Sequence, residues 1–143
     1  MAELFLIAEI AGRRVAFPSS QVESVVDVGE IVPVPRVAPE VGGVAALRSR
    51  VVTVIDSRVA LGMVRDTRVR KRAVVAAVEG HSYALLVDSL DDVTPLECQN
   101  MGGGVALDPA WQRVVCGLVE RDGEPIPVLR PAALVPGANT AFD

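Results

Sequence analysis

Apolar residues fall along this chain in short runs that are separated by polar connections containing glycine. One pair of runs covers residues 5–10 and 15–17, and a second pair covers residues 73–78 and 83–87. Short apolar runs on both sides of a glycine-containing connection are typical of antiparallel β-hairpins. The pattern therefore predicts one hairpin at the start of the chain and a related one near its middle.

Each of these hairpins is followed by another pair of apolar runs. Residues 44–47 and 51–55 form the earlier pair, and residues 114–119 and 126–129 form the later one. The connection within the later pair contains Asp-Gly, a strong hairpin-turn signal. The pattern thus predicts two further hairpins.

Two short segments, each following a predicted strand, are expected to form single helical turns. Residues 59–62 and 132–135 are small and apolar. Asp56 precedes the first segment and can cap it, and Pro131 suits the first position of the second. We expect only these short helical turns beside the strands.

The chain also repeats itself. One alignment of the chain with itself, the first shift, places Gly12 on Gly80, and another, the second shift, places Gly43 on Gly117. Two consistent shifts indicate an internal duplication, with halves at residues 1–66 and 67–143 that meet in a basic segment. Each half has four or five short strands, and closure into a barrel removes exposed strand edges. We therefore predict a mostly β protein built from two tandem five-stranded barrels.

Composition narrows the class of protein. Half of the residues are hydrophobic but only 3% are aromatic, so the core is aliphatic. The net charge of −4 gives no general attraction to nucleic acid. No apolar run is long enough for a membrane helix, and no basic segment opens the chain as in a signal peptide. The sequence predicts a cytoplasmic protein without membrane insertion, in which Cys98 and Cys116 are free and buried.

The sequence contains only weak candidates for catalytic or metal-binding residues. His81 lies in a predicted turn, where it reads as an exposed residue without a base or nucleophile nearby in sequence. Asp88, Asp91 and Asp92 lack the spacing of a calcium loop and read as a solvated strand end. The glycines at 102–104 are not followed by the Lys of a phosphate loop. We predict no catalytic residue, no metal and no cofactor.

The basic segment at residues 64–72 offers a further alternative. Such a run can bind nucleic acid, but this one contains no aromatic residue for base stacking. A solvated or partner-facing linker is the favoured interpretation. A nucleic-acid-binding tandem barrel remains the weaker one.

One stretch resembles a known signature. Residues 43–58 read Gly-Val-Ala-Ala-Leu-Arg-Ser-Arg-Val-Val-Thr-Val-Ile-Asp-Ser-Arg. This resembles the pattern Gly-Val-x-x-Leu-Arg-Gly-x-Val-x-Pro-Val-x-Asp-Leu-Arg of the CheW family of bacterial chemotaxis coupling proteins. Further pieces match in the same order, at residues 22–25, 32–33, 86–93 and 116–118. The resemblance runs from about Leu4 to Leu134.

The resemblance implies both a fold and a function. The fold is two SH3-like barrels that together form one CheW-like domain. The function is that of a non-enzymatic adaptor, a scaffold that joins the cytoplasmic tips of chemoreceptors to the regulatory domain of a CheA-type histidine kinase in chemotaxis. Such a protein is cytoplasmic and is recruited to membrane-associated receptor arrays. The alternatives are a detached kinase regulatory domain and a CheW-like domain that serves another two-component pathway.

The chain departs from the family pattern at four positions. Ser49 replaces Gly, Thr53 replaces Pro, and Ser57 replaces Leu. Ser24 stands where Glu is common, with Glu23 beside it. Loss of the glycine removes easy access to positive φ, so we expect a different type of turn at Ser49. At Ser24 we expect that a charge contact to a partner is lost or moved.

Family positions, carried over one at a time, imply two binding surfaces. A receptor-binding groove between the barrels is implied for Val22, Gly43, Arg48, Leu90, Val93 and Gly117. A kinase-binding edge on the first barrel is implied near Asp27 and Val51. The alternative for the Val and Leu residues is burial in the core, and for the two glycines it is strand-end geometry. Arg48 is the strongest candidate, because an arginine in a turn has little reason to be buried.

Overall fold

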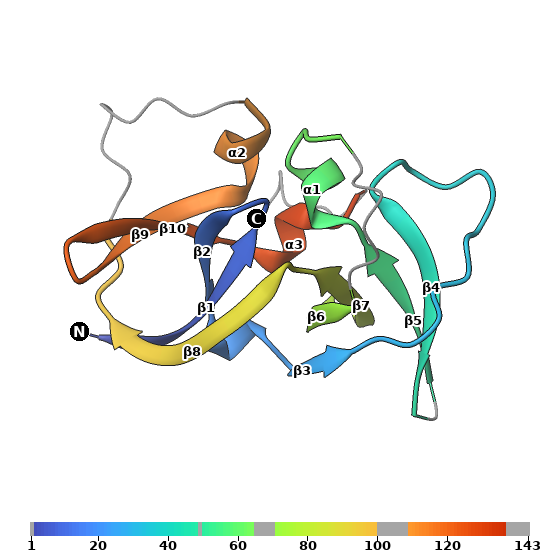
Figure 1. The fold of residues 1–143 in the computed structure, drawn as a ribbon, viewed down its shortest axis with the longest axis horizontal. Coiled ribbons are helices and arrows are strands. Elements are labelled where there is room, and N and C mark those ends of the chain that lie inside the picture. Colours follow the sequence, from blue (N-terminus) through green and yellow to red (C-terminus); the bar gives the residue numbers. More distant parts are fainter. Residues whose placement is uncertain (1, 49, 65–70, 100–108, 137–143) are drawn as a thin grey trace.

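The protein is described here by a computed structural model that covers residues 2–48, 50–64, 71–99 and 109–136. Ten strands and a few short helices make up these residues (Figure 1). The strands are β1 (Glu3–Ile10), β2 (Arg13–Pro18), β3 (Ser24–Asp27), β4 (Val41–Leu47), β5 (Arg50–Ile55), β6 (Arg72–Val78), β7 (His81–Leu86), β8 (Ser89–Leu96), β9 (Val115–Arg121) and β10 (Glu124–Leu129). The helices are a 3-10 turn η1 (Ser19–Gln21), α1 (Ser57–Ala60), α2 (Pro109–Val114) and α3 (Pro131–Leu134).

The strands form two five-stranded sheets that exchange strands between the halves of the chain. Sheet 1 has the order β8-β1-β2-β10-β9, and sheet 2 has the order β3-β6-β7-β5-β4. Both the mostly β class and the tandem arrangement are confirmed. The division at residue 66 does not describe the sheets, however, because each sheet contains strands from both halves. The boundary itself falls within 65–70, outside the described residues.

All four predicted hairpins are present. Three of them close through pairs of positive-φ residues, with values of 56° and 79° at 11–12, 53° and 82° at 79–80, and 53° and 82° at 122–123. Consecutive positive φ angles define the type I′ turn, whose twist matches that of paired strands. The β4–β5 connection also begins with a positive φ, 55° at Arg48.

The packing confirms the internal duplication. The interior of sheet 1 is formed by Phe5, Ile7, Ala16, Val119, Ile126 and Val128. The first shift places Phe5, Ile7 and Ala16 on Ala73, Val75 and Ala84. The second shift relates Val119, Ile126 and Val128 to Ala45, Val52 and Val54 in the same way. These six equivalent residues line the interior of sheet 2. The two halves therefore use equivalent positions to fill equivalent cores.

A third and larger core lies between the sheets. Leu6, Ala8 and Ile10 of β1 meet Val74 and Val78 of β6 in this cluster. Because alternate residues of these strands also face the sheet interiors, β1 and β6 are buried on both faces. This explains why both strands are nearly continuous apolar runs in the sequence.

Barrel closure is incomplete. The edges of sheet 2 approach each other through one isolated bridge, Val32 to Val44, and those of sheet 1 through Gln99 to Leu118. In sheet 2, Pro33 and Pro35 follow the bridge and have no N–H to continue a ladder. The two sheets are open barrels with a narrow seam, so the expectation of closed barrels is wrong.

The caps of the helical turns are as predicted. The Asp56 side chain accepts hydrogen bonds from the backbone N–H groups of Arg58, at 3.1 Å, and Val59, at 3.3 Å. Pro131 opens α3. The helix α2 is an addition that the hydrophobic pattern did not predict, as are the strands β3 and β8.

Replacement of the cap should destabilise the protein measurably. We expect Asp56→Ala to lower the free energy of unfolding by about 1–2 kcal/mol, because the residue is buried and satisfies two backbone donors. Urea denaturation followed by circular dichroism measures this change. Asp27→Ala removes an exposed ion pair to Arg72 and should change it by less than about 0.5 kcal/mol. Equal effects of the two substitutions would contradict the capping role.

Candidate protein-binding surfaces

Arg48 lies at the tip of the β4–β5 hairpin and is exposed. It lines a hollow of about 560 Å³ together with Val25, Asp27 and Arg50. Its guanidinium has no hydrogen-bond or ion-pair partner among the residues that the structure describes. The hairpin therefore presents a cation with free donors beside an apolar side chain.

The polar side chains next to Arg48 are paired with one another. The Arg50 guanidinium donates to the Ser82 hydroxyl at 3.0 Å, and that hydroxyl donates to the Glu23 carboxylate at 3.0 Å. Arg50 and Glu23 also form an ion pair at 3.9 Å. Glu23, the carboxylate beside the divergent Ser24, thus contacts Arg50 and Ser82 of its own chain.

The two residues carried over to the kinase-binding edge are both exposed. Val51 is 69% exposed. Asp27, on the edge strand β3, forms an ion pair at 3.1 Å with Arg72 of the neighbouring β6. Core packing does not account for Val51, and an apolar residue so exposed is available for a partner.

Val22 and Leu90 are related by the first shift. Both are partly buried and pack against the core between the sheets. Val22 lines a hollow of about 350 Å³ with Glu23, Ala77 and Pro131. Val93 of β8, by contrast, is 51% exposed. The structure thus places Val22 and Leu90 at the junction of the sheets and leaves Val93 at the surface.

Gly43 and Gly117 are equivalent residues in the two seams. A Cβ atom on Gly43 would lie 2.3 Å from the Val32 carbonyl oxygen, and one on Gly117 would lie 2.6 Å from the Cys98 sulfur. Both glycines are buried. Their absent side chains let the segment after each edge strand cross close to the opposite edge, which is the strand geometry given above as the alternative to direct contact.

The remaining candidates for catalysis or metal binding have structural roles or lie at the surface. Arg121 binds Asp91 at 2.9 Å and Asp92 at 2.8 Å. The hydrogen bond to Asp91 raises the pKa of Arg121. No cluster of metal-binding side chains occurs among the described residues. His81 is exposed, and the glycines at 102–104 lie outside the described part of the chain.

The two cysteines are free, but the prediction that they are buried is wrong. Cys116 alternates along β9 with the buried Val115 and Gly117, so it lies on the outer face. Partial desolvation is the main cause that raises the pKa of both thiols. They are protonated at neutral pH and are therefore weak nucleophiles.

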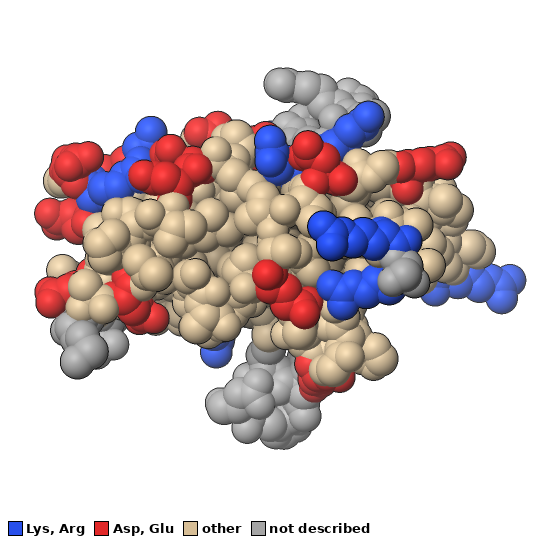
Figure 2. Space-filling model, turned by 90° about the horizontal axis from the view of Figure 1, so that it is seen from below, with Lys and Arg blue, Asp and Glu red and all other residues tan. Residues whose placement is uncertain are grey.

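Charge is distributed unevenly over the molecule. Figure 2 shows basic side chains clustered over the end that holds sheet 2, while acidic side chains are spread over both ends. The exposed cations at the sheet 2 end are Arg36, Arg48, Arg50, Lys71 and Arg72. No helix in the described residues is long and apolar enough to span a membrane.

A family model for the CheW-like domain matches residues 4–138. The chain belongs to the CheW-like family. The curated protein "Chemotaxis protein CheW" of Thermotoga maritima is 29% identical over 115 residues, which cover 80% of this chain and 76% of that protein. The crystal structure of the scaffolding protein TtCheW from Thermoanaerobacter tengcongensis matches with a TM-score of 0.81 at 20% identity, covering 94% of this chain and 92% of that one. The shared fold is that of CheW-like domains.

Several exposed side chains were not among the predicted site residues. Val25, Val32, Val34 and Val37 are all exposed, although they lie in the Val-rich first half. Val32 and Val34 alternate with proline in the segment after β3, which a sequence reader could have taken as a sign of extended, unpaired chain. Arg13 and Trp111, which stack on each other, were also missed.

Proposed function

We propose that the chain is a non-enzymatic adaptor that couples the cytoplasmic tip of a chemoreceptor to the regulatory domain of a CheA-type histidine kinase. Membership of the CheW-like family supports this, as do a relative named as a chemotaxis protein and a solved structure named as a scaffolding protein. The adaptor acts in the cytoplasm and is recruited to receptor arrays. It contributes binding surfaces and carries out no chemistry.

The observation that carries the proposal is an exposed apolar side chain, Val25, beside the unpaired cation Arg48 on sheet 2. Five of the eight large exposed hydrophobic side chains of the described residues come from one stretch of the chain, Val25, Val32, Val34, Val37 and Val51. Val25 shares its hollow with Arg48. Protein interfaces combine an apolar centre with a charged rim in this way.

The two partners would use adjoining parts of the domain, since Arg48 lines the same hollow as Asp27. The kinase regulatory domain would cover Val51 and Asp27 on sheet 2. The receptor tip would bind at the junction between the sheets, near Val22 and Leu90, with Arg48 as a donor to its carboxylate or carbonyl groups. Coupling then requires only that the contact energies differ between the two signalling states of the receptor.

Reconstitution tests the proposal. The purified chain is mixed with a chemoreceptor cytoplasmic fragment and a CheA-type kinase from the same organism, and both sedimentation of the complex and kinase autophosphorylation are measured. We expect a ternary complex in which receptor-dependent control of the kinase requires the chain. Absence of binding to both partners would refute the proposal.

Arg48→Ala should weaken receptor binding by about three- to tenfold, because a charge-assisted hydrogen bond is lost while the exposed hairpin stays folded. Titration calorimetry with the receptor fragment measures the affinity. Arg113→Ala is the control, since Arg113 is also exposed and lies on α2, outside the proposed surface. Equal affinity of the Arg48 variant and the unmodified chain would remove Arg48 from the site.

A further inference from the structure

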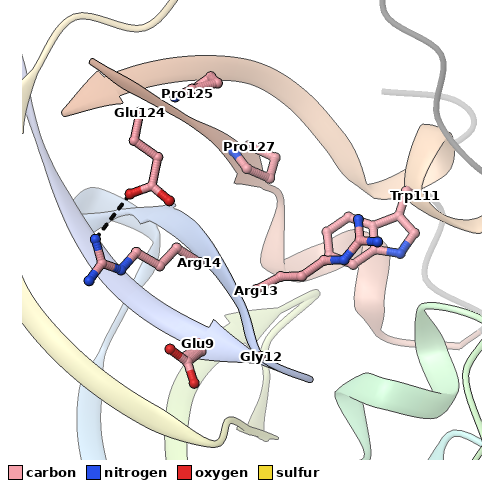
Figure 3. A pocket seen from close by; sticks show the side chains of 8 residues that line it. All are labelled: Glu9, Gly12, Arg13, Arg14, Trp111, Glu124, Pro125 and Pro127. Carbon is pink, nitrogen blue, oxygen red and sulfur yellow. Dashed lines mark hydrogen bonds and ion pairs between the residues drawn. The ribbon is translucent and has the colours of Figure 1, made fainter. Parts of the chain in front are cut away.

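A hollow on sheet 1 contains the stacked pair Arg13 and Trp111. It opens between β2 and β10 and measures about 660 Å³, a size within the usual range of ligand sites. Its lining comes from the β1–β2 hairpin, from β10 and from α2 (Figure 3). None of its residues belongs to the receptor or kinase surfaces proposed above.

The hollow lies beside two parallel strands whose ladder pairing is short. β2 and β10 pair only at Ala16 with Val128. The equivalent strands of sheet 2, β7 and β5, pair at three positions, including Thr53 with Tyr83. The second shift places Thr53 on Pro127, and proline has no N–H to donate. Pro127 therefore cannot donate to the ladder at this position of sheet 1, and the rings of Pro125 and Pro127 line the space.

One cation in this hollow is positioned but unpaired. The Arg13 guanidinium lies over the Trp111 ring, 5.7 Å from its centroid. Arg13 has no carboxylate partner among the described residues, whereas its neighbour Arg14 is paired with Glu124 at 3.0 Å. Stacking on an aromatic ring restricts the side chain and leaves the guanidinium edge free for a bidentate acceptor.

The charges of the hollow select among ligands. Glu9 and Glu124 also line it, so two carboxylates and two guanidiniums balance. A polyanion such as RNA would meet repulsion from Glu9, whereas Arg14 compensates the charge of Glu124. A single carboxylate can pair with Arg13, while apolar groups beside it pack on the proline rings.

We propose that this hollow binds an extended segment of a partner protein in which one acidic residue lies next to proline or another apolar residue. Arg13 receives the carboxylate, and Pro125, Pro127 and the edge of Trp111 contact the apolar part. Recognition of extended peptides by aromatic- and proline-lined surfaces follows the same physical pattern. The site is independent of coupling to a receptor or kinase.

The chain carries its own reporter for the test. Trp111 is its only tryptophan, so tryptophan fluorescence reports on this hollow and on the core in which the ring is packed. The probe is an acetylated and amidated peptide, Ala-Pro-Leu-Glu-Pro-Ala, and the control probe has Gln in place of Glu. We expect a saturable change in emission, with the Gln peptide binding about tenfold more weakly. This comparison needs no variant of the protein.

Variants then locate the carboxylate. Arg13→Gln should weaken binding of the Glu peptide about tenfold and make the two peptides equal. Arg113→Gln, an exposed arginine on the same helix as Trp111, should leave both affinities unchanged. The proposal is overturned by absence of a saturable change, by equal binding of the two peptides to the unmodified chain, or by equal effects of the two variants. A change of oligomeric state with Arg13→Gln in sedimentation would overturn it in favour of a second copy of the chain.

Discussion

Gly43→Ala is expected to lower the free energy of unfolding by about 3 kcal/mol or more, enough to unfold much of the protein at moderate temperature. A Cβ atom there would lie 2.3 Å from the Val32 carbonyl oxygen and 2.8 Å from its carbonyl carbon. Backbone atoms cannot rotate away as a side chain can. Gly43 also has a φ of 140°, which other residues rarely adopt. Thermal and urea denaturation measure the loss.

Substitutions at two other glycines distinguish the effect of a steric clash from the effect of backbone strain. Gly12 has a φ of 79° but no atom within 4 Å of an added Cβ, so Gly12→Ala should cost about 1 kcal/mol. Gly29 has neither feature, and Gly29→Ala should be close to neutral. If Gly43→Ala were no more destabilising than Gly12→Ala, the close approach at the seam would not be a constraint.

Val51→Glu is expected to weaken binding of the kinase regulatory domain by tenfold or more, about 1.4 kcal/mol or greater. The substitution places a carboxylate at the centre of the proposed apolar contact, where the partner would remove its water. Since Val51 is 69% exposed, the folded chain itself should tolerate the charge. Calorimetric titration with the isolated regulatory domain measures the affinity, and receptor binding should be unchanged.

Val64→Glu is the control for that experiment. Val64 is 88% exposed and lies outside the proposed surface, so the same chemical change there should leave kinase affinity as it is. Equal weakening by both substitutions would point to a general effect of net charge. Retained affinity in the Val51 variant would place the kinase contact elsewhere.

The hairpins could be predicted because their signals are local. A tight turn such as Asp122–Gly123 fixes the register of the strands on either side, and the apolar runs identify the strands. The core could be predicted in the same way. Residues such as Ile7 and Val75 occupy equivalent places in the repeat and fill equivalent interiors.

The exchange of strands could not be predicted from those signals. β8 begins at Ser89 and pairs with β1, which begins at Glu3, and nothing in the local sequence encodes so distant a partner. β8 also carries Asp91 and Asp92, which read as a solvated segment until Arg121 is seen to pair with them. Charge compensation by a distant arginine is invisible to a hydrophobic pattern.

Family positions could name candidate site residues but not their surroundings. They name Arg48 as a candidate, and the structure shows the hollow beside it. The same positions grouped Val93 with Leu90, whereas Val93 is far more exposed. Side-chain exposure depends on which strands meet at an edge, and so it requires the fold.

The strand exchange also limits how the two sheets can move. Only residues 19–23 connect β2 of sheet 1 to β3 of sheet 2, and only residues 87–88 lead back from β7 to β8. These short crossings act together with the core that both sheets share. A partner that pulls on sheet 2 is therefore expected to carry sheet 1 with it, so that two partners bound on the two sheets would keep a fixed separation.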